Sequence, residues 1–314
     1  MGEVVIEPSK GVPYFGTVEK PECHMLYNVT TMASTWHTVA TKDVRLLKRQ
    51  MNQLSELPKD YIFLNYLRCH DDIGWGLDYD WLKKFGISEI PHKKFLNDYF
   101  TGKFPDSNAR GELYNNDPRL GDARLCGTTA SLCGIEAALE DKDTDKLEKS
   151  LDCDIMLHAY MLTQSGIPVL YSGDEIGQLN DYSYHDNPEK SVDSRYLHRG
   201  KFNWKLAENC DDSDTVQGRI FQSILILEKC RAENEVFRAE ADFQTVDTGS
   251  DSVLGICREY ENKKLLAYFN FSDNPQSVFL DGVKSGRDLF TDDEVCSISI
   301  ELKPYGFSWL LLDE

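Results

Sequence analysis

The chain has 314 residues, of which 41% are hydrophobic and 28% are charged, and its formal net charge at pH 7 is -19. This length allows one large domain with an appendage, or two ordinary domains. The apolar residues fall in short groups, not in one run approaching the roughly 20 residues that span a bilayer. Nucleic acid binding needs a concentrated basic face, which the acidic charge opposes. We therefore expect a soluble globular protein with a small neutral or cationic substrate, and neither nucleic acid nor a membrane as partner.

The nine cysteines are scattered singly, without a CxxC pair. An odd number with no paired spacing is neither a disulfide framework nor a zinc site, so we expect buried thiols in a reducing compartment. The first residues, MGEVVIEPSKG, contain no basic region followed by a long apolar segment and predict no secretory signal. These features predict a cytoplasmic protein, with the reservation that a signal on a fuller upstream chain would be missing from this sequence.

Residues 25–30 and 62–69 are short apolar runs with the composition of strands. Between them, apolar side chains recur at helical spacing from Val44 to Leu54, after Thr41 as a candidate helix cap. This pattern predicts a strand, a helix and a second strand.

A second unit has the same pattern. Ile155, Ala159 and Leu162 share one helix face, Gly166 is suited to a left-handed turn that ends the helix, and residues 167–171 are expected to form a buried strand. Alternating units of this kind predict a parallel sheet with helices outside it.

Two further segments depart from this alternation. Residues 73–127 are rich in aromatic, Gly and Asn/Asp residues, and so long an excursion after a strand is usually functional. From about residue 240, strand-like segments alternate with turns such as ENKK and SDNP, which predicts a small antiparallel β domain.

The sequence RCHDDIGW, residues 68–75, follows the predicted strand IFLNYL. In a βα barrel, catalytic side chains emerge at the carboxyl ends of strands, so we expect His70, Asp71 and Asp72 to face one shared mouth. Closely placed carboxylates stabilise the positive charge that develops on a sugar ring when a glycosidic bond breaks, and an imidazole can hold a hydroxyl. The alternative is that the aspartates only cap the next helix.

The segment GIPVLYSGDEIG, residues 166–177, is another strand that runs into a turn. Gly173 and Asp174 suit a tight turn, and the simplest interpretation of Glu175 is a structural one. This segment supports the fold more than the chemistry.

Four segments resemble, in order and spacing, the amylosucrases of the α-amylase family: FLNYLRCHDDIGW, GDARLCGTTASLCG, GIPVLYSGDEIGQLNDYSY and SVDSRYLHRGKFNW. The resemblance runs from about residue 3 to the end, where LKPYGFSWLLL is similar to the family's C-terminal β domain. It implies an α/β fold: residues 1–238 as the C-terminal part of a TIM (β/α)8 barrel with an inserted subdomain near 73–127, and residues 239–314 as an all-β antiparallel C-terminal domain.

The resemblance implies three catalytic carboxylates in the family: an aspartate nucleophile on the fourth strand, a glutamate acid/base at the end of the fifth, and an aspartate stabiliser after the seventh. Asp71 matches the stabiliser and His70 its neighbour. Asp72 resembles a residue that helps to hold the acceptor-side sugar. Glu3, in GEVVIEP, resembles the acid/base, although the third residue of a chain is usually frayed.

Two arginines complete the site that the resemblance implies. Arg124, in GDARLCG, and Arg195, in VDSRYLHR, match arginines that bind the fructosyl side of sucrose in that family. The simpler alternative for each is a surface ion pair, the commonest fate of an arginine in an acidic protein.

The function implied is a retaining glucosyltransferase or glycoside hydrolase acting on sucrose or related α-glucosides, with an α-glucan acceptor and with neither cofactor nor metal. A sucrose hydrolase, another transglycosidase of the family or a non-catalytic remnant is the alternative. If Glu3 closes the fifth strand, the nucleophile lies upstream of Met1. A retaining mechanism needs two carboxylates roughly 5 to 5.5 Å apart, so we expect this C-terminal fragment to be inactive by itself.

Overall fold

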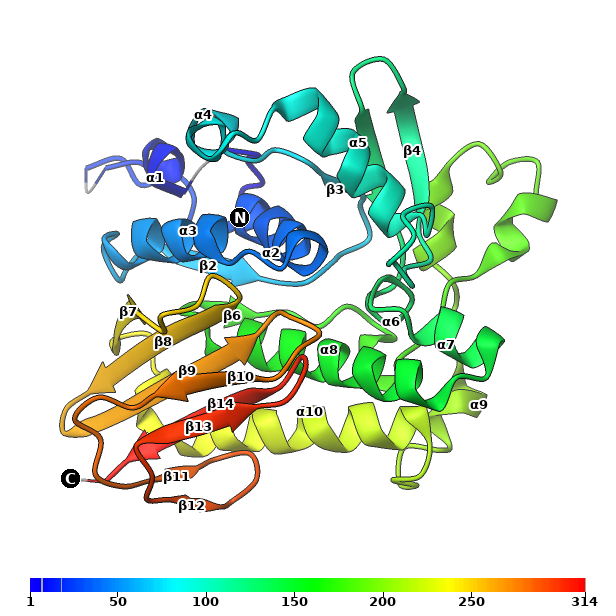
Figure 1. Cartoon of the computed structure of the whole chain (residues 1–314). Coiled ribbons are helices and arrows are strands. Elements are labelled where there is room, and N and C mark those ends of the chain that lie inside the picture. Colours follow the sequence, from blue (N-terminus) through cyan, green and yellow to red (C-terminus); the bar gives the residue numbers. More distant parts are fainter. Residues whose placement is uncertain (7, 18, 314) are drawn as a thin grey trace. The chain divides into compact units, whose positions relative to one another are not determined.

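The computed structural model describes residues 1–6, 8–17 and 19–313 (Figure 1). The chain separates into two compact units. The first comprises Met1–Asn65, Met156–Val169 and Ile224–Glu314, and the second comprises Tyr66–Ile155 and Leu170–Ser223. Among the described residues, no helix is both long and apolar enough to cross a lipid bilayer.

A parallel sheet organises the first unit. Strands β1 (Met25–Tyr27), β2 (Ile62–Asn65) and β6 (Ile167–Pro168) lie in that order and all run in the same direction. On the free side of β1, Gly2 forms a further parallel bridge with Leu26. Neighbouring parallel segments in chain order are expected for consecutive strands of a βα barrel, and no closed barrel occurs within the described ranges.

The helix α2 (Val29–Thr41) begins where the sequence predicts the end of a strand. Its first twelve residues are all buried, so it has no apolar stripe of the kind that periodicity detects. Three of its threonine hydroxyls donate to a carbonyl oxygen one turn earlier, which satisfies polar groups that the interior would otherwise leave unpaired: Thr35, Thr38 and Thr41.

The helix predicted from Val44 to Leu54 is α3 (Arg45–Ser55), and Val44 is the residue that precedes it. The prediction of Thr41 as its cap was wrong, because Thr41 is the last residue of α2. Two short helices lie earlier in the chain: α1 (Pro8–Gly11) and η1 (Val12–Phe15).

The second predicted unit is confirmed in its helix but not in its strand. Helix α8 (Thr144–Thr163) ends shortly before Gly166, whose φ of 113° is the left-handed turn expected there. A side chain at Gly166 would also clash with the carbonyl oxygen of Phe63. The predicted buried strand 167–171 is reduced to β6 at the edge of the sheet, where Ile167 is 42% exposed.

The second unit contains an antiparallel sheet in the order β3 (Ile73–Gly74), β5 (Asp122–Cys126) and β4 (Glu112–Asp117). Its α-helices, besides the first part of α8 and the first part of α10 (Val216–Glu233), are α4 (Tyr79–Leu82), α5 (Glu89–Phe100), α6 (Thr129–Leu132), α7 (Ile135–Asp141) and α9 (Trp204–Ala207). Short 3-10 helices complete it: η2 (Lys83–Phe85), η3 (Asp174–Ile176), η4 (Tyr182–Asp186) and η5 (Ser194–His198). The segment 73–127 therefore has secondary structure of its own.

The predicted antiparallel β domain is present. It follows α10 (Val216–Glu233) and η6 (Glu235–Phe237), and the strands of its main sheet lie in the order β12, β11, β14, β9, β8, β7 (Figure 1). Their bounds are β7 (Asp242–Val246), β8 (Val253–Tyr260), β9 (Lys263–Asn270), β11 (Gly286–Asp288), β12 (Glu294–Val295) and β14 (Phe307–Leu312). A separate pair consists of β10 (Gln276–Phe279) and β13 (Ser299–Leu302). The domain boundary at residue 238 stays a prediction.

One buried arginine joins the β domain to the rest of the first unit. Arg258, on β8, is 0% exposed and donates hydrogen bonds to the carbonyl oxygens of Val236, Thr163 and Arg238. A further bond reaches the hydroxyl of Ser165. Burial lowers the pKa of Arg258 to about 9, so it remains charged at neutral pH and uses that charge on backbone oxygens.

Candidate functional site

Asp71 lies between two guanidinium groups in the second unit. Its Oδ1 atom is 3.3 Å from Nη1 of Arg195 and 3.2 Å from Nη2 of Arg199. Its Oδ2 atom is 3.3 Å from Nε2 of His70. The Asp71 side chain is 34% exposed, so a small molecule can still reach the carboxylate.

Asp193 orients the first of these arginines. Its carboxylate accepts hydrogen bonds from Nε and Nη2 of Arg195 at 2.9 and 2.8 Å, and from the Arg195 backbone N–H at 3.0 Å. The Arg195 guanidinium also stacks 4.9 Å above the ring of Tyr114. The hydrogen bond from Arg195 lowers the pKa of Asp193, so the pair is charged at neutral pH.

Arg199 is a site residue that sequence reasoning missed. Besides Asp71, it reaches the carbonyl oxygen of His70 through Nε at 2.5 Å. Arg195 and Arg199 lie at the two ends of η5, four residues apart in SVDSRYLHRG. The spacing of these two arginines is the signal that the sequence offers for Arg199, whereas the resemblance implies Arg195 alone.

Asp72 and Arg124 form a looser pair in the same unit. Arg124 Nε is 3.8 Å from Asp72 Oδ2, and the Arg124 side chain is 47% exposed. Burial raises the pKa of Asp72, and the nearby Arg124 charge partly offsets this effect. Arg124 sits on β5 opposite Gly74, where a Cβ atom would displace the Arg124 guanidinium from its present position.

A buried ion pair joins the segment RCHDDIGW, residues 68–75, to the segment GIPVLYSGDEIG, residues 166–177. Arg68 Nε is 2.8 Å from Asp174 Oδ1, with side chains 2% and 3% exposed. The Arg68 guanidinium also lies 4.5 Å above the ring of Tyr171. Asp174 was expected only as a residue of a tight turn, and it also neutralises the charge of Arg68, two residues before His70.

His198 forms hydrogen bonds with the backbone on both sides of its ring. Its Nδ1 atom accepts the N–H of Gly127 at 3.1 Å, and its Nε2 atom lies 3.3 Å from the carbonyl oxygen of His70. Burial, with a contribution from the Arg68 charge, lowers the pKa of His198 to about 3. The ring is thus neutral, and Nε2 carries the proton that it donates to His70.

The structure thus brings most of the predicted site residues together in contacting pairs within the second unit: His70 and Asp71, Asp71 and Arg195, and Asp72 and Arg124. Glu3 belongs to the first unit, where it is exposed and follows the Gly2 bridge to β1. The convergence of Glu3 with Asp71 stays a prediction.

Cys69, His70 and Asp71 offer possible metal-ligand atoms within 4.8 Å of one another. The same Asp71 carboxylate already faces two guanidinium groups, which repel a further cation at this distance. The arrangement therefore suits an uncharged ligand better than a metal ion.

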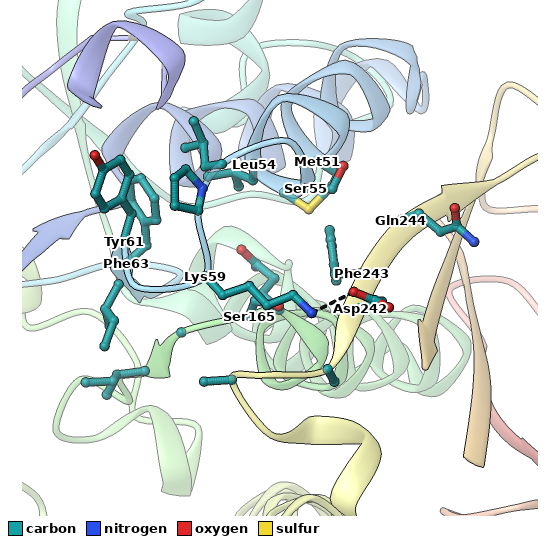
Figure 2. A pocket seen from close by; sticks show the side chains of 18 of the residues that line it. Met51, Leu54, Ser55, Lys59, Tyr61, Phe63, Ser165, Asp242, Phe243 and Gln244 are labelled. Atoms are coloured by element: carbon teal, nitrogen blue, oxygen red, sulfur yellow. Dashed lines mark hydrogen bonds and ion pairs between the residues drawn. The ribbon is translucent and has the colours of Figure 1, made fainter. Parts of the chain in front are cut away.

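A hollow of about 510 Å³ lies in the first unit, between the end of α3, the following loop and β7. Figure 2 shows Tyr61, Phe63 and Phe243 around it and the ion pair of Lys59 with Asp242, 2.6 Å apart. Ile62 and Ile167, the first residues of β2 and β6, also line it, so it opens at the amino ends of these strands. The catalytic side chains of βα barrels emerge at the opposite ends.

Comparisons with known proteins agree with this architecture. Residues 243–309 match the maltogenic amylase C-terminal domain. Over 312 residues the chain is 24% identical to glucosylglycerate phosphorylase of Escherichia coli (strain K12), covering 98% of this chain and 52% of that protein. The chain therefore spans about half the length of this curated relative.

Solved structures support the fold. AmyP in complex with maltose superimposes with a TM-score of 0.64 and 14% identity over 98% of this chain and 54% of that one. Trehalose-6-phosphate hydrolase of Bacillus licheniformis superimposes with a TM-score of 0.56 and 15% identity, covering 99% of this chain and 56% of that one. An Anoxybacillus α-amylase superimposes with a TM-score of 0.54 and 16% identity, covering 100% of this chain and 52% of that one. These likenesses confirm the predicted partial TIM barrel with an all-β C-terminal domain.

Proposed function

We propose that this chain, which is related to the α-amylase family by fold and by its C-terminal domain, contributes to a retaining glucosyltransferase or glycoside hydrolase that acts on sucrose or related α-glucosides. The observation that carries the proposal is Asp71, a reachable carboxylate fixed between Arg195 and Arg199 in the segment that directly follows β2. A fixed carboxylate at that place stabilises the positive charge of an oxocarbenium-like sugar ring.

The reaction divides into two steps. An aspartate supplied from outside these residues attacks the anomeric carbon of the glucosyl unit, while Glu3 donates a proton to the departing sugar oxygen. Asp71 stabilises the ring during this step. Glu3 then takes a proton from water or from an acceptor hydroxyl, whose oxygen receives the glucosyl group and releases the aspartate.

The remaining predicted residues hold sugar hydroxyls in this proposal. His70 is 62% exposed at its side chain and places its imidazole beside Asp71. Asp72 and Arg124 form the acceptor side. Their separation of 3.8 Å leaves donors and acceptors on both for a bound sugar.

The narrower likeness to amylosucrases favours an α-glucan as acceptor. The phosphorylase named among the relatives supports a second candidate, in which inorganic phosphate accepts the glucosyl group. The half-exposed guanidinium of Arg124 is suited to either acceptor, since arginine binds phosphate as readily as it donates to hydroxyls.

We also propose a cytoplasmic location. All nine cysteines fall within the described residues, and the structure leaves each of them as a free thiol. Free thiols are typical of reducing compartments. A non-catalytic remnant remains the alternative to the enzyme, and the following experiment decides between them.

The test uses a longer protein that supplies the upstream barrel strands, together with the 314-residue chain. Each is incubated with sucrose, with and without inorganic phosphate, and released fructose and glucose 1-phosphate are measured. We expect fructose from the longer protein only, and loss of activity in its Glu3→Gln and Asp71→Asn variants. Steady turnover by the 314-residue chain, or full activity of Asp71→Asn, contradicts the proposal, and inactivity of the longer protein favours the remnant.

A further inference from the structure

An exposed tryptophan that packs against a half-buried phenylalanine stands out on the surface of the second unit. Trp204, the first residue of α9, is 77% exposed, and its ring lies 4.7 Å from that of Phe202 at an angle of 61°. A tryptophan usually buries most of its large apolar surface, so a ring left so open is informative. We name Phe202 and Trp204 the aromatic platform.

The backbone that carries the platform is held in place. The side chain of Gln178 accepts the N–H of Asn203 at 2.9 Å and donates to the carbonyl oxygen of Lys201 at 3.1 Å. Asn203 also caps α9 by accepting the N–H of Leu206 at 3.2 Å. A ligand that stacks on the platform therefore meets a preorganised loop and has little ordering cost to overcome.

The platform follows directly on the candidate site along the chain. Arg199, which contacts Asp71 and the backbone of His70, precedes Phe202 by only three residues. The residues around the rings are polar or cationic, with Lys201, Asn203 and Lys205 all exposed. These groups offer hydrogen bonds to hydroxyls around an apolar centre.

We propose that the aromatic platform binds an α-glucan chain and delivers it to the candidate site as acceptor. A pyranose ring presents C–H groups on one face and hydroxyls at its rim, which matches two rings bordered by Lys201 and Asn203. A protein partner needs about 800 Å² of surface on each side, far more than two rings bordered by charge provide. The net charge of -19 opposes nucleic acid. This inference rests on the proposed function, because it names the acceptor of the same site.

The test reads binding on the 314-residue chain and does not depend on turnover. Native electrophoresis through gels with and without glycogen is combined with titration of tryptophan fluorescence by maltoheptaose. We expect retardation by glycogen, a weakening of about tenfold or more in Trp204→Ala, and a smaller loss in Trp204→Phe. The matched control is Val192→Ala, which removes an apolar side chain that is 81% exposed but has no ring.

Two results overturn the inference: equal retardation of Trp204→Ala and the parent chain, or no retardation of the parent. Loss of a dimer in Trp204→Ala, measured by sedimentation, also overturns it and identifies the platform as a contact between copies. The Asp71→Asn chain should still bind glycogen. Failure of the proposed function therefore appears as lost turnover with binding intact, whereas failure of this inference appears as lost binding alone.

Discussion

Asp193 receives the guanidinium of Arg195 in a two-point ion pair, which leaves only Nη1 of the arginine to face Asp71. Most donors of Arg195 are therefore occupied by carboxylates. This geometry makes Arg195 a positioning residue for Asp71 in addition to the sugar ligand that the resemblance implies. The consequence can be measured through Asp193, which acts on Asp71 by way of Arg195.

We predict that Asp193→Asn in the longer, active protein lowers kcat by about tenfold to a hundredfold with a smaller change in KM, since misplacement of a catalytic group by about 1 Å costs this much. The matched control is Asp117→Asn. Asp117 holds Arg119 through the same two-point contact in an exposed turn, at 3.1 and 2.9 Å. Equal kinetics of the two variants contradict a positioning role.

The buried pair of Arg68 and Asp174 leads to a stability prediction. Arg68→Met leaves the Asp174 carboxylate buried without its partner, and we expect a loss of about 3 to 5 kcal/mol in the free energy of unfolding. Urea denaturation measures it. The double variant Arg68→Met with Asp174→Leu should recover much of the loss, because two apolar groups need no charge partner. A double variant no more stable than the single one contradicts this account.

The neutral histidine His198 leads to a pH prediction. Its folded pKa of about 3 lies below the ordinary value of 6.5, so between these values the unfolded chain binds more protons than the folded one. Stability therefore falls as pH drops from about 6.5 toward 3, by up to about 1.4 kcal/mol per pH unit for this group. His92, whose pKa burial lowers to about 4, adds a similar slope.

The measurement is the free energy of unfolding from urea titrations at several pH values between 4 and 7. His198→Gln can keep both hydrogen bonds, one accepted from Gly127 and one donated to His70, but cannot gain the proton. We expect a shallower slope in this variant. His24→Gln, at an exposed position, is the control and should keep the parent slope. An unchanged slope in His198→Gln shows that His198 does not titrate as described.

Regular hydrophobic patterns predicted the fold where a helix or strand has one buried face. The α8 residues Ile155, Ala159 and Leu162, predicted to share one helix face, are all buried. Helix α2 was missed because it is buried all round and rich in threonine, so its sequence carries no period. Hydrophobic periodicity arises from the contrast between a buried and an exposed face. It therefore cannot reveal a helix that is buried on all sides.

The residues by themselves predicted the candidate site only in its local motif, and the resemblance added Arg124 and Arg195. Asp71 and His70 follow a strand, and that position was enough to propose them. Arg199 and Asp174 act through contacts with residues more than one hundred positions away, Arg199 with Asp71 and Asp174 with Arg68. No spacing rule encodes such contacts, since they depend on how η5 and η3 meet the RCHDD segment in the folded unit.

Arg258 carries the last prediction. Its guanidinium reaches three backbone carbonyl oxygens and one hydroxyl from a fully buried position, and only a planar fork with five donors can serve acceptors in so many directions. Arg258→Met removes all these donors and leaves the carbonyl oxygens unpaired in the interior, which costs at least about 3 kcal/mol. Arg258→Lys should lose nearly as much, because a single ammonium group cannot reach acceptors on both sides.

The experiment compares urea midpoints of these two variants with that of Arg287→Met, an arginine on β11 whose side chain is 58% exposed. We expect the exposed substitution to change stability by less than about 0.5 kcal/mol. We also expect Arg258→Met to unfold the β domain and the end of α8 together, because the arginine joins β8 to Thr163. Arg258→Met as stable as the parent chain would show that the carbonyl oxygens find other donors, and that this arginine does not hold the β domain to the end of α8.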